Sequence, residues 1–202
     1  MRVLAVNGSP RKEGNTFLLL KKVLEPLASA GWETELVQFA DYRLEGCTGC
    51  MGCFATGDGR CVGRPDDDFA ALFERILSAD ALVLGSPCYF ASITAELKAL
   101  IDRAGLVAMA GGGLLRGKIG AAVVAQRRGG ATHAFDTINH LFQISQMIVP
   151  GSTYWNFGVG LEAGDVCSDD EGNANMAHLG AVIAWLGKAI GPHRDAYPTA
   201  AP

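Results

Sequence analysis

Short apolar runs alternate along this chain with segments in which apolar residues recur at helical spacing. The run 3–6 is long enough for a buried strand, and the apolar positions of 17–27 follow the period of a helix. Pro26 lies inside that helical pattern and predicts an end or a kink there. The predicted strands are 3–6, 33–39, 80–84, 119–125 and material within 147–157, with helices between them and a closing helix at 173–190.

Most of the predicted strands are almost wholly apolar, which is typical of a parallel sheet covered by helices on both faces. Five strand–helix units fit a doubly wound α/β fold with the flavodoxin-like strand order 2-1-3-4-5. We expect a single domain spanning residues 1–202, with a cysteine-rich loop, 41–65, inserted after the second strand. Ligands of such sheets bind beyond the carboxyl ends of the strands. The loops 8–16, 86–90 and 126–130 should therefore converge on one site.

The first of these loops has the composition of a phosphate-binding loop. It offers a helix N-terminus together with Ser9, Arg11, Gly14, Asn15 and Thr16. It lacks the lysine of a Walker A loop and the glycine spacing of a dinucleotide fingerprint. A terminal monophosphate, such as that of FMN, fits what remains. An ordinary strand–helix turn is the alternative.

The other two loops provide candidates for a flat heterocycle. In Ser86-Pro87-Cys88-Tyr89-Phe90, the two aromatic residues offer ring surface, proline fixes the backbone and the cysteine fills space under the ligand. In the third loop, Gln126 offers an amide, and Gly129 and Gly130 allow close backbone approach. An ordinary turn in 86–90 and solvated arginines in 126–130 are the alternatives.

Four of the six cysteines fall within the 41–65 segment. Cys47, Cys50, Cys53 and Cys61 have the spacing C-x2-C-x2-C-x7-C, with glycines interspersed. Thiolates at this spacing suit one [4Fe–4S] cluster, and glycines let backbone N–H groups turn toward sulfur. A four-thiolate zinc site and a metal-free, thiol-rich loop are the alternatives.

Charge and hydropathy exclude several functional classes. The net charge is −4 and the pI is about 5.5, which gives no basis for binding nucleic acid or a membrane surface. No apolar run reaches transmembrane length, and the chain opens on a strand rather than a signal peptide, so a cytoplasmic location is expected.

The chain combines the motifs 7–11, 14–16, 85–87 with Tyr89, 97–98 and 102–103. Taken together, these motifs resemble the NADPH-dependent FMN reductase family, and the cysteine motif is similar to that of its iron–sulfur flavoprotein branch. The resemblance implies a flavodoxin-like fold with FMN, a homodimer or homotetramer, and a [4Fe–4S] cluster near the flavin of a neighbouring subunit.

The expected function is that of an FMN-dependent oxidoreductase. It would pass electrons between a reduced donor, NAD(P)H or ferredoxin-like, and a small-molecule or protein acceptor through FMN and the cluster. NAD(P)H is a possible co-substrate, and no side chain is predicted as a catalytic acid or base. A cluster-free NAD(P)H:quinone reductase and a flavodoxin-like electron carrier are the alternatives. The apolar and aromatic 147–157 segment predicts a homo-oligomeric contact.

Overall fold

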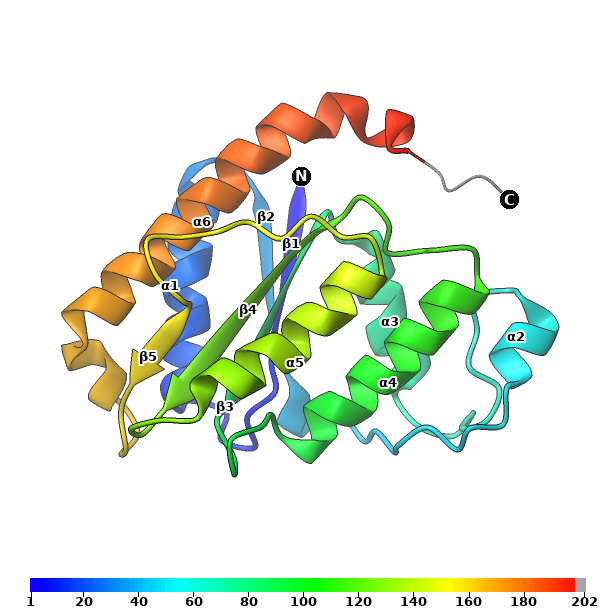
Figure 1. Cartoon of the computed structure of the whole chain (residues 1–202), viewed down its shortest axis with the longest axis horizontal. Coiled ribbons are helices and arrows are strands. Elements are labelled where there is room, and N and C mark those ends of the chain that lie inside the picture. Colours follow the sequence, from blue (N-terminus) through cyan, green and yellow to red (C-terminus); the bar gives the residue numbers. More distant parts are fainter. Residues whose placement is uncertain (199–202) are drawn as a thin grey trace.

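The computed structural model describes residues 1–198 and contains one five-stranded parallel sheet (Figure 1). Its strand order is β2-β1-β3-β4-β5, which confirms the predicted flavodoxin-like topology. Parallel pairing holds throughout, with Val3 opposite both Thr34 and Ala81. The strands are β1 (Arg2–Asn7), β2 (Glu33–Gln38), β3 (Ala81–Pro87), β4 (Ile119–Gln126) and β5 (Phe157–Val159).

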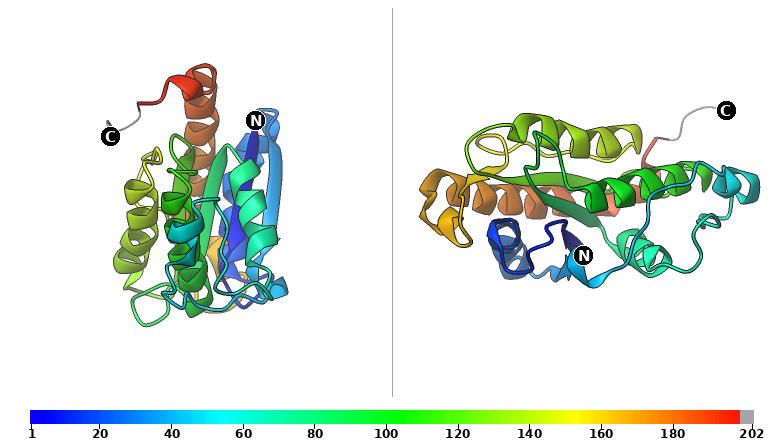
Figure 2. Two further views of the ribbon diagram at one scale, coloured as in Figure 1. Left: turned by 90° about the vertical axis from the view of Figure 1, so that its right-hand side faces the viewer. Right: turned by 90° about the horizontal axis from the view of Figure 1, so that it is seen from below.

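Helices cover both faces of this sheet (Figure 2). Alternate residues of β1 point to opposite faces: Val3 and Ala5 pack under α1 and α6, whereas Leu4 and Val6 pack under α3, α4 and α5. All four are fully buried, which explains why the run 3–6 is apolar at every position. The helices are α1 (Asn15–Ser29), α2 (Gly52–Thr56), α3 (Phe69–Ser78), α4 (Ala95–Ala110), α5 (Ala131–Ile144) and α6 (Asp170–Ile190), with short 3-10 helices at Phe39–Asp41, Asp165–Ser168 and Gly191–Ala196.

Pro26 was predicted to end or kink the first helix, and of these two outcomes the first does not occur. α1 continues to Ser29, and the proline sits in its last turn, where it removes a single intrahelical hydrogen bond. Helix α6 crosses α1 closely at this point. A Cβ on Gly180 would lie 2.1 Å from the Val23 carbonyl oxygen and 2.5 Å from Pro26 Cγ.

The last strand is also shorter than the 147–157 segment that was expected to supply it. Only Phe157–Val159 pairs regularly with β4, and Ile148 forms one isolated bridge with Ile119. The segment between them runs over the protein surface, which leaves Tyr154 and Trp155 exposed.

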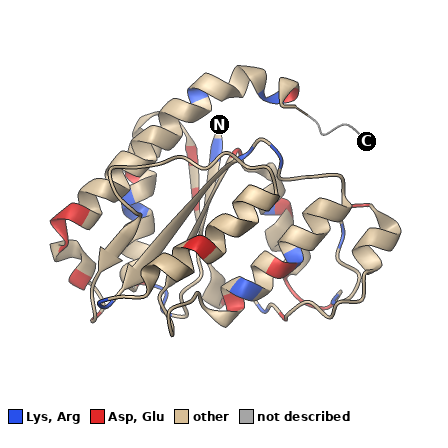
Figure 3. Cartoon of the chain, viewed as in Figure 1, with Lys and Arg blue, Asp and Glu red and all other residues tan. Residues whose placement is uncertain are grey.

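The carboxyl ends of the strands gather along the lower edge of the molecule in Figure 1. The cysteine-rich segment, including α2, extends to the far side of α4 (Figure 1). Figure 3 shows that acidic and basic residues are scattered along the helices. Among the described helices, none combines the length and apolarity needed to cross a lipid bilayer.

Candidate functional site

The carboxyl edge of the sheet contains an open cavity. The first loop contributes its polar residues, and the ends of β3, β4 and β5 close the other sides. This arrangement brings together the three predicted loops and a fourth that the sequence did not indicate. The lining residues are Ser9, Arg11, Gly14, Asn15, Thr16, Pro87, Cys88, Tyr89, Ala125, Gln126, Arg127, Gly160 and Leu161.

The buried side chain of Asn7 fixes the start of the first loop through hydrogen bonds. Its amide nitrogen donates to Gln38 Oε1 (2.7 Å), and its Oδ1 accepts from the Ser9 backbone N–H (3.2 Å). The Ser9 hydroxyl in turn accepts from the Arg11 backbone N–H (3.1 Å). Within residues 1–198 no carboxylate pairs with the Arg11 guanidinium, so this cation is available to a ligand.

The N-terminus of α1 opens into the cavity behind this loop. Gly14 occupies its N-cap position in extended geometry and offers no side chain to cap the first N–H groups. The Asn15 side chain is occupied elsewhere: it donates to the Glu162 carbonyl (2.9 Å) and accepts from the Gly164 N–H (2.9 Å). Asn15 therefore connects the loop after β5 to α1 by hydrogen bonds. The backbone N–H groups at the start of α1 and Thr16 are then the groups that can bind an anion.

The first and second loops meet at Gly8. Its N–H donates to the Gly85 carbonyl (2.8 Å), and a Cβ at this position would lie 2.8 Å from that same oxygen. The Gly8 carbonyl accepts from Thr94 Oγ1 (2.7 Å), and the Thr94 N–H donates to Ser86 Oγ (3.1 Å). Ser86, predicted to touch a ligand, is fully buried and anchors the start of α4 instead.

Residues 89–92 form a tight hairpin beside the cavity. Tyr89 and Ser92 exchange backbone hydrogen bonds of 2.8 and 2.9 Å. Phe90 and Ala91 at the tip have φ values of 48° and 60°, a left-handed conformation that costs free energy in residues other than glycine. Tyr89 lines the cavity, whereas Phe90 is fully exposed and does not line it. Of the two predicted aromatic residues, Tyr89 alone is at the site.

The third loop packs against this hairpin. A Cβ on Gly130 would lie 3.1 Å from Ala91 Cα and 3.2 Å from Cys88 Sγ. Gly129 and Gly130 support the neighbouring loop without lining the cavity, whereas Gln126 lines it. Cys88 also lines the cavity, and burial raises the pKa of its thiol, which keeps it neutral.

This cavity fits FMN on the chemistry of its lining. An uncapped helix N-terminus, small hydroxyl side chains and the guanidinium of Arg11 suit a phosphate monoester. Pro87 and Tyr89 then provide a flat, partly apolar wall next to it for a heterocycle.

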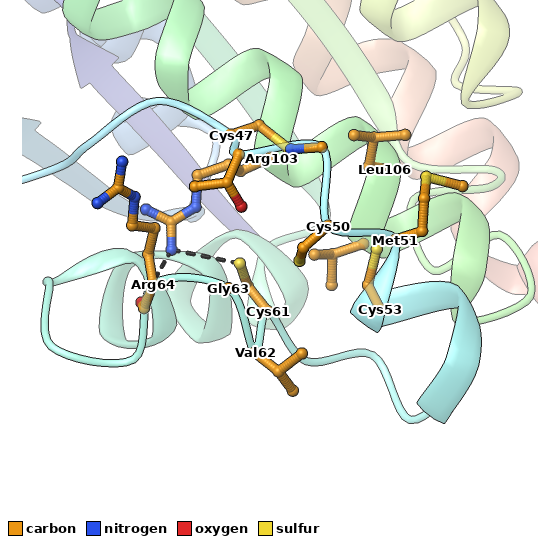
Figure 4. A pocket seen from close by; sticks show the side chains of 13 residues that line it. Cys47, Cys50, Met51, Cys53, Cys61, Val62, Gly63, Arg64, Arg103 and Leu106 are labelled. Atoms are coloured by element: carbon orange, nitrogen blue, oxygen red, sulfur yellow. Dashed lines mark hydrogen bonds between the residues drawn. The ribbon is translucent and has the colours of Figure 1, made fainter.

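A second cavity lies between the cysteine-rich segment and α4 (Figure 4). Cys47, Cys50, Cys53 and Cys61 all line it, together with Arg103 and other residues of α4. The sequence predicted the grouping of the four thiols but not their packing against α4. Within the described residues, no three side chains of Cys, His, Asp or Glu converge on a single-ion position.

Hydrogen-bond donors face several of these sulfur atoms. The Gly49 N–H donates to Cys47 Sγ (3.4 Å), and Arg103 Nη2 donates to Cys61 Sγ (3.4 Å). Hydrogen bonds from the Gly52 backbone and the Thr48 hydroxyl lower the pKa of the Cys50 thiol. Donors aimed at sulfur stabilise thiolates, so the cavity fits a cysteine-ligated iron–sulfur cluster.

Glycines make room for the sulfur of Cys50. A Cβ on Gly63 would lie 2.8 Å from Cys50 Sγ, and one on Gly52 would lie 2.3 Å from Val62 Cγ2. The two isolated cysteines lie outside this cavity, with Cys88 at the carboxyl edge of the sheet and Cys167 exposed near the start of α6.

A flavodoxin-like sheet with an anion-binding loop after its first strand defines a class of flavin-binding proteins. The chain belongs to the NADPH-dependent FMN reductase family, whose model matches residues 1–162, and within it to the iron–sulfur flavoprotein branch. It is a flavin-dependent oxidoreductase.

Two relatives and one solved structure illustrate this membership. An iron-sulfur flavoprotein of Methanocaldococcus jannaschii is 38% identical over 197 residues, covering 94% of this chain and 99% of that protein. An iron-sulfur flavoprotein of Archaeoglobus fulgidus is 36% identical, covering 82% of each chain. The fold is also that of an NADH:FMN oxidoreductase solved in its apo form, with a TM-score of 0.60 at 20% identity, covering 89% of this chain and 88% of that one.

Proposed function

We propose that this oxidoreductase holds FMN at the carboxyl edge of the sheet and one [4Fe–4S] cluster on Cys47, Cys50, Cys53 and Cys61. It passes electrons between a reduced donor, NAD(P)H or a ferredoxin-like protein, and an acceptor. The observation that carries the proposal is that all four thiols line one cavity whose donors face sulfur. The names of the two archaeal relatives agree with it.

The residues around each site bind and orient; none acts as an obligatory acid or base. Arg11 and the N-terminus of α1 bind the phosphate, and Tyr89 flanks the ring. When bound, FMN exchanges electrons in pairs or singly and the cluster exchanges them singly, so the two together link both modes of transfer. Because different loops build the two cavities, loss of the cluster should leave the FMN site intact.

Anaerobic steady-state kinetics test this proposal against its alternatives. The wild-type protein and Cys50→Ala are compared with NADH, with NADPH and with a reduced ferredoxin as donor, and with a quinone or a one-electron protein as acceptor. The proposal expects both variants to contain FMN, and Cys50→Ala to lose turnover with the one-electron acceptor. Equal turnover of both variants with every acceptor would make the protein a cluster-free reductase. Electron exchange between the reduced ferredoxin and the one-electron protein, with neither nucleotide oxidised nor quinone reduced, would make it a carrier.

We further propose that the chain forms one FMN-binding domain that assembles with copies of itself as a dimer or tetramer in the cytoplasm. The surface segment before β5 supports self-association, because Tyr154 and Trp155 are more than half exposed there and Val149 is partly exposed. An apolar, aromatic surface of this kind is typical of the core of a protein–protein interface.

A further inference from the structure

The guanidinium of Arg103 joins the two ends of the cysteine-rich segment. Its side chain is 1% exposed, and it reaches from α4 toward the cysteine cavity (Figure 4). Nη1 donates to the Glu45 carbonyl (3.1 Å), before the first cysteine, and Nη2 donates to the Arg64 carbonyl (3.2 Å), after the last one. Nη2 also donates to Cys61 Sγ (3.4 Å).

Asp67 holds this guanidinium from the other side. Its carboxylate forms an ion pair with Nη1 and accepts from Nη2 at 3.0 Å. It also accepts from the backbone N–H groups of Glu45 (3.0 Å) and Phe69 (3.2 Å). The ring of Phe69 stacks on the guanidinium, with its centroid 4.2 Å from Arg103 Cζ. The arginine is thus fixed in place with Nη1 and Nη2 directed at the cysteine-rich segment, while its buried Nε–H has no partner among the described residues.

Stability alone does not account for this arrangement. Desolvating two charges offsets most of the attraction within a buried ion pair, and apolar residues of similar size often stabilise a core as well. An apolar residue could not replace the hydrogen bonds to the Glu45 and Arg64 carbonyls or to Cys61 Sγ, and the last of these reaches a proposed cluster ligand directly. Among the four cysteines of the segment, Cys61 is the one farthest along the chain from the others, so it depends most on an external support.

We propose that Arg103 is a positioning residue for the cysteine site, acting through Cys61, and that it raises the reduction potential of the cluster. This inference rests on the function proposed above. Arg103 fixes the segment so that Cys61 faces the same cavity as the other three thiols. Reduction adds one negative charge to a cysteine-ligated cluster, and a hydrogen bond from a cation to sulfur stabilises that charge.

Two sets of substitutions separate this role from a purely structural one. The double variant Asp67→Asn/Arg103→Gln removes both buried charges, keeps a polar amide side chain at each position and leaves the net charge unchanged. Arg103→Lys keeps the positive charge but loses the fork that reaches several partners at once. The matched control is Lys98→Gln/Asp102→Asn, which removes an exposed ion pair from the same helix.

Each protein is reconstituted anaerobically with iron and sulfide, and its FMN content verifies that it is folded. The measurements are the midpoint potential of the cluster, from a spectroscopic redox titration, and the rate of iron release to a chelator. We expect the neutral double variant to have a lower midpoint potential and to release iron faster. A shift of the reduction equilibrium of about tenfold toward the oxidised form corresponds to a midpoint potential 59 mV lower for one electron. Arg103→Lys should lie between it and the wild type, and the control should match the wild type.

Three outcomes would overturn the inference. If a folded variant releases iron faster but keeps the wild-type potential, Arg103 is a structural clamp only. If the midpoint potential and the rate of iron release both keep their wild-type values in Arg103→Lys and also in the double variant, the contact to Cys61 has no role. If the wild-type protein itself takes up no iron, the proposed cluster fails and the inference fails with it. The wild-type result thus shows which of the two claims is wrong.

Discussion

Replacing Arg11 with alanine tests the anion-binding loop without disturbing the fold. The guanidinium lines the cavity and has no carboxylate partner in the described residues, so its removal breaks no ion pair. A hydrogen bond to a charged group contributes about 1.5–3 kcal/mol. FMN should therefore bind about 10- to 150-fold more weakly to the variant. Riboflavin, which lacks the phosphate, should bind both proteins weakly and equally.

Titration of the apoprotein, followed by quenching of flavin fluorescence, measures all four affinities. Lys12→Ala is the matched control, because the neighbouring lysine pairs with Asp41 on the surface and does not line the cavity. This variant should retain FMN affinity. Equal affinity of the wild-type protein for FMN and riboflavin, or an equal loss of both in Arg11→Ala, would refute the assignment of the loop.

Three further substitutions test other parts of the structure. Gly8→Ala should destabilise the protein by about 1–3 kcal/mol in chemical denaturation and weaken FMN binding, because its Cβ meets the Gly85 carbonyl at 2.8 Å; wild-type stability would refute this. Burial raises the pKa of Asp80, but the ion pair with Arg194 and other hydrogen bonds outweigh it, so the folded pKa is lowered. The ionised Asp80 stabilises the fold fully above its unfolded pKa of about 4, and this stabilisation is lost as the pH falls through the folded pKa. The melting temperature of Asp80→Asn should therefore fall less steeply on acidification than that of the wild type, and an equally steep fall would contradict this. Light scattering should give a dimeric or tetrameric mass for the wild type and a smaller one for Trp155→Asp, whereas a wild-type monomer at micromolar concentration would rule out self-association.

The strand order was predictable because each buried strand is a short, almost wholly apolar run between polar turns. The loop 8–16 was recognisable for a similar reason, since its turn residues and its helix lie next to each other in the sequence. The predicted roles of Ser86 and Phe90 depended on side-chain direction, which sequence does not give. Ser86 faces the start of α4, and the hairpin carries Phe90 into solvent.

Residues brought together from distant segments could not be predicted from the sequence. Arg103 is one position on an otherwise ordinary helix, and only folding places it against Asp67 and Cys61. Gly160 and Leu161 were missed because the last strand was placed within 147–157. In the structure β5 ends at Val159, so the loop that closes the cavity starts later in the chain.

The metal content of protein purified and reconstituted without oxygen tests the central claim most directly. The account predicts about four iron and four sulfide per chain, with visible absorbance that bleaches on reduction. Cys50→Ala should lose the iron and keep FMN, and Cys167→Ser, whose cysteine lies outside the cavity, should keep both. A wild-type protein that binds FMN but stays free of iron after reconstitution would contradict the account.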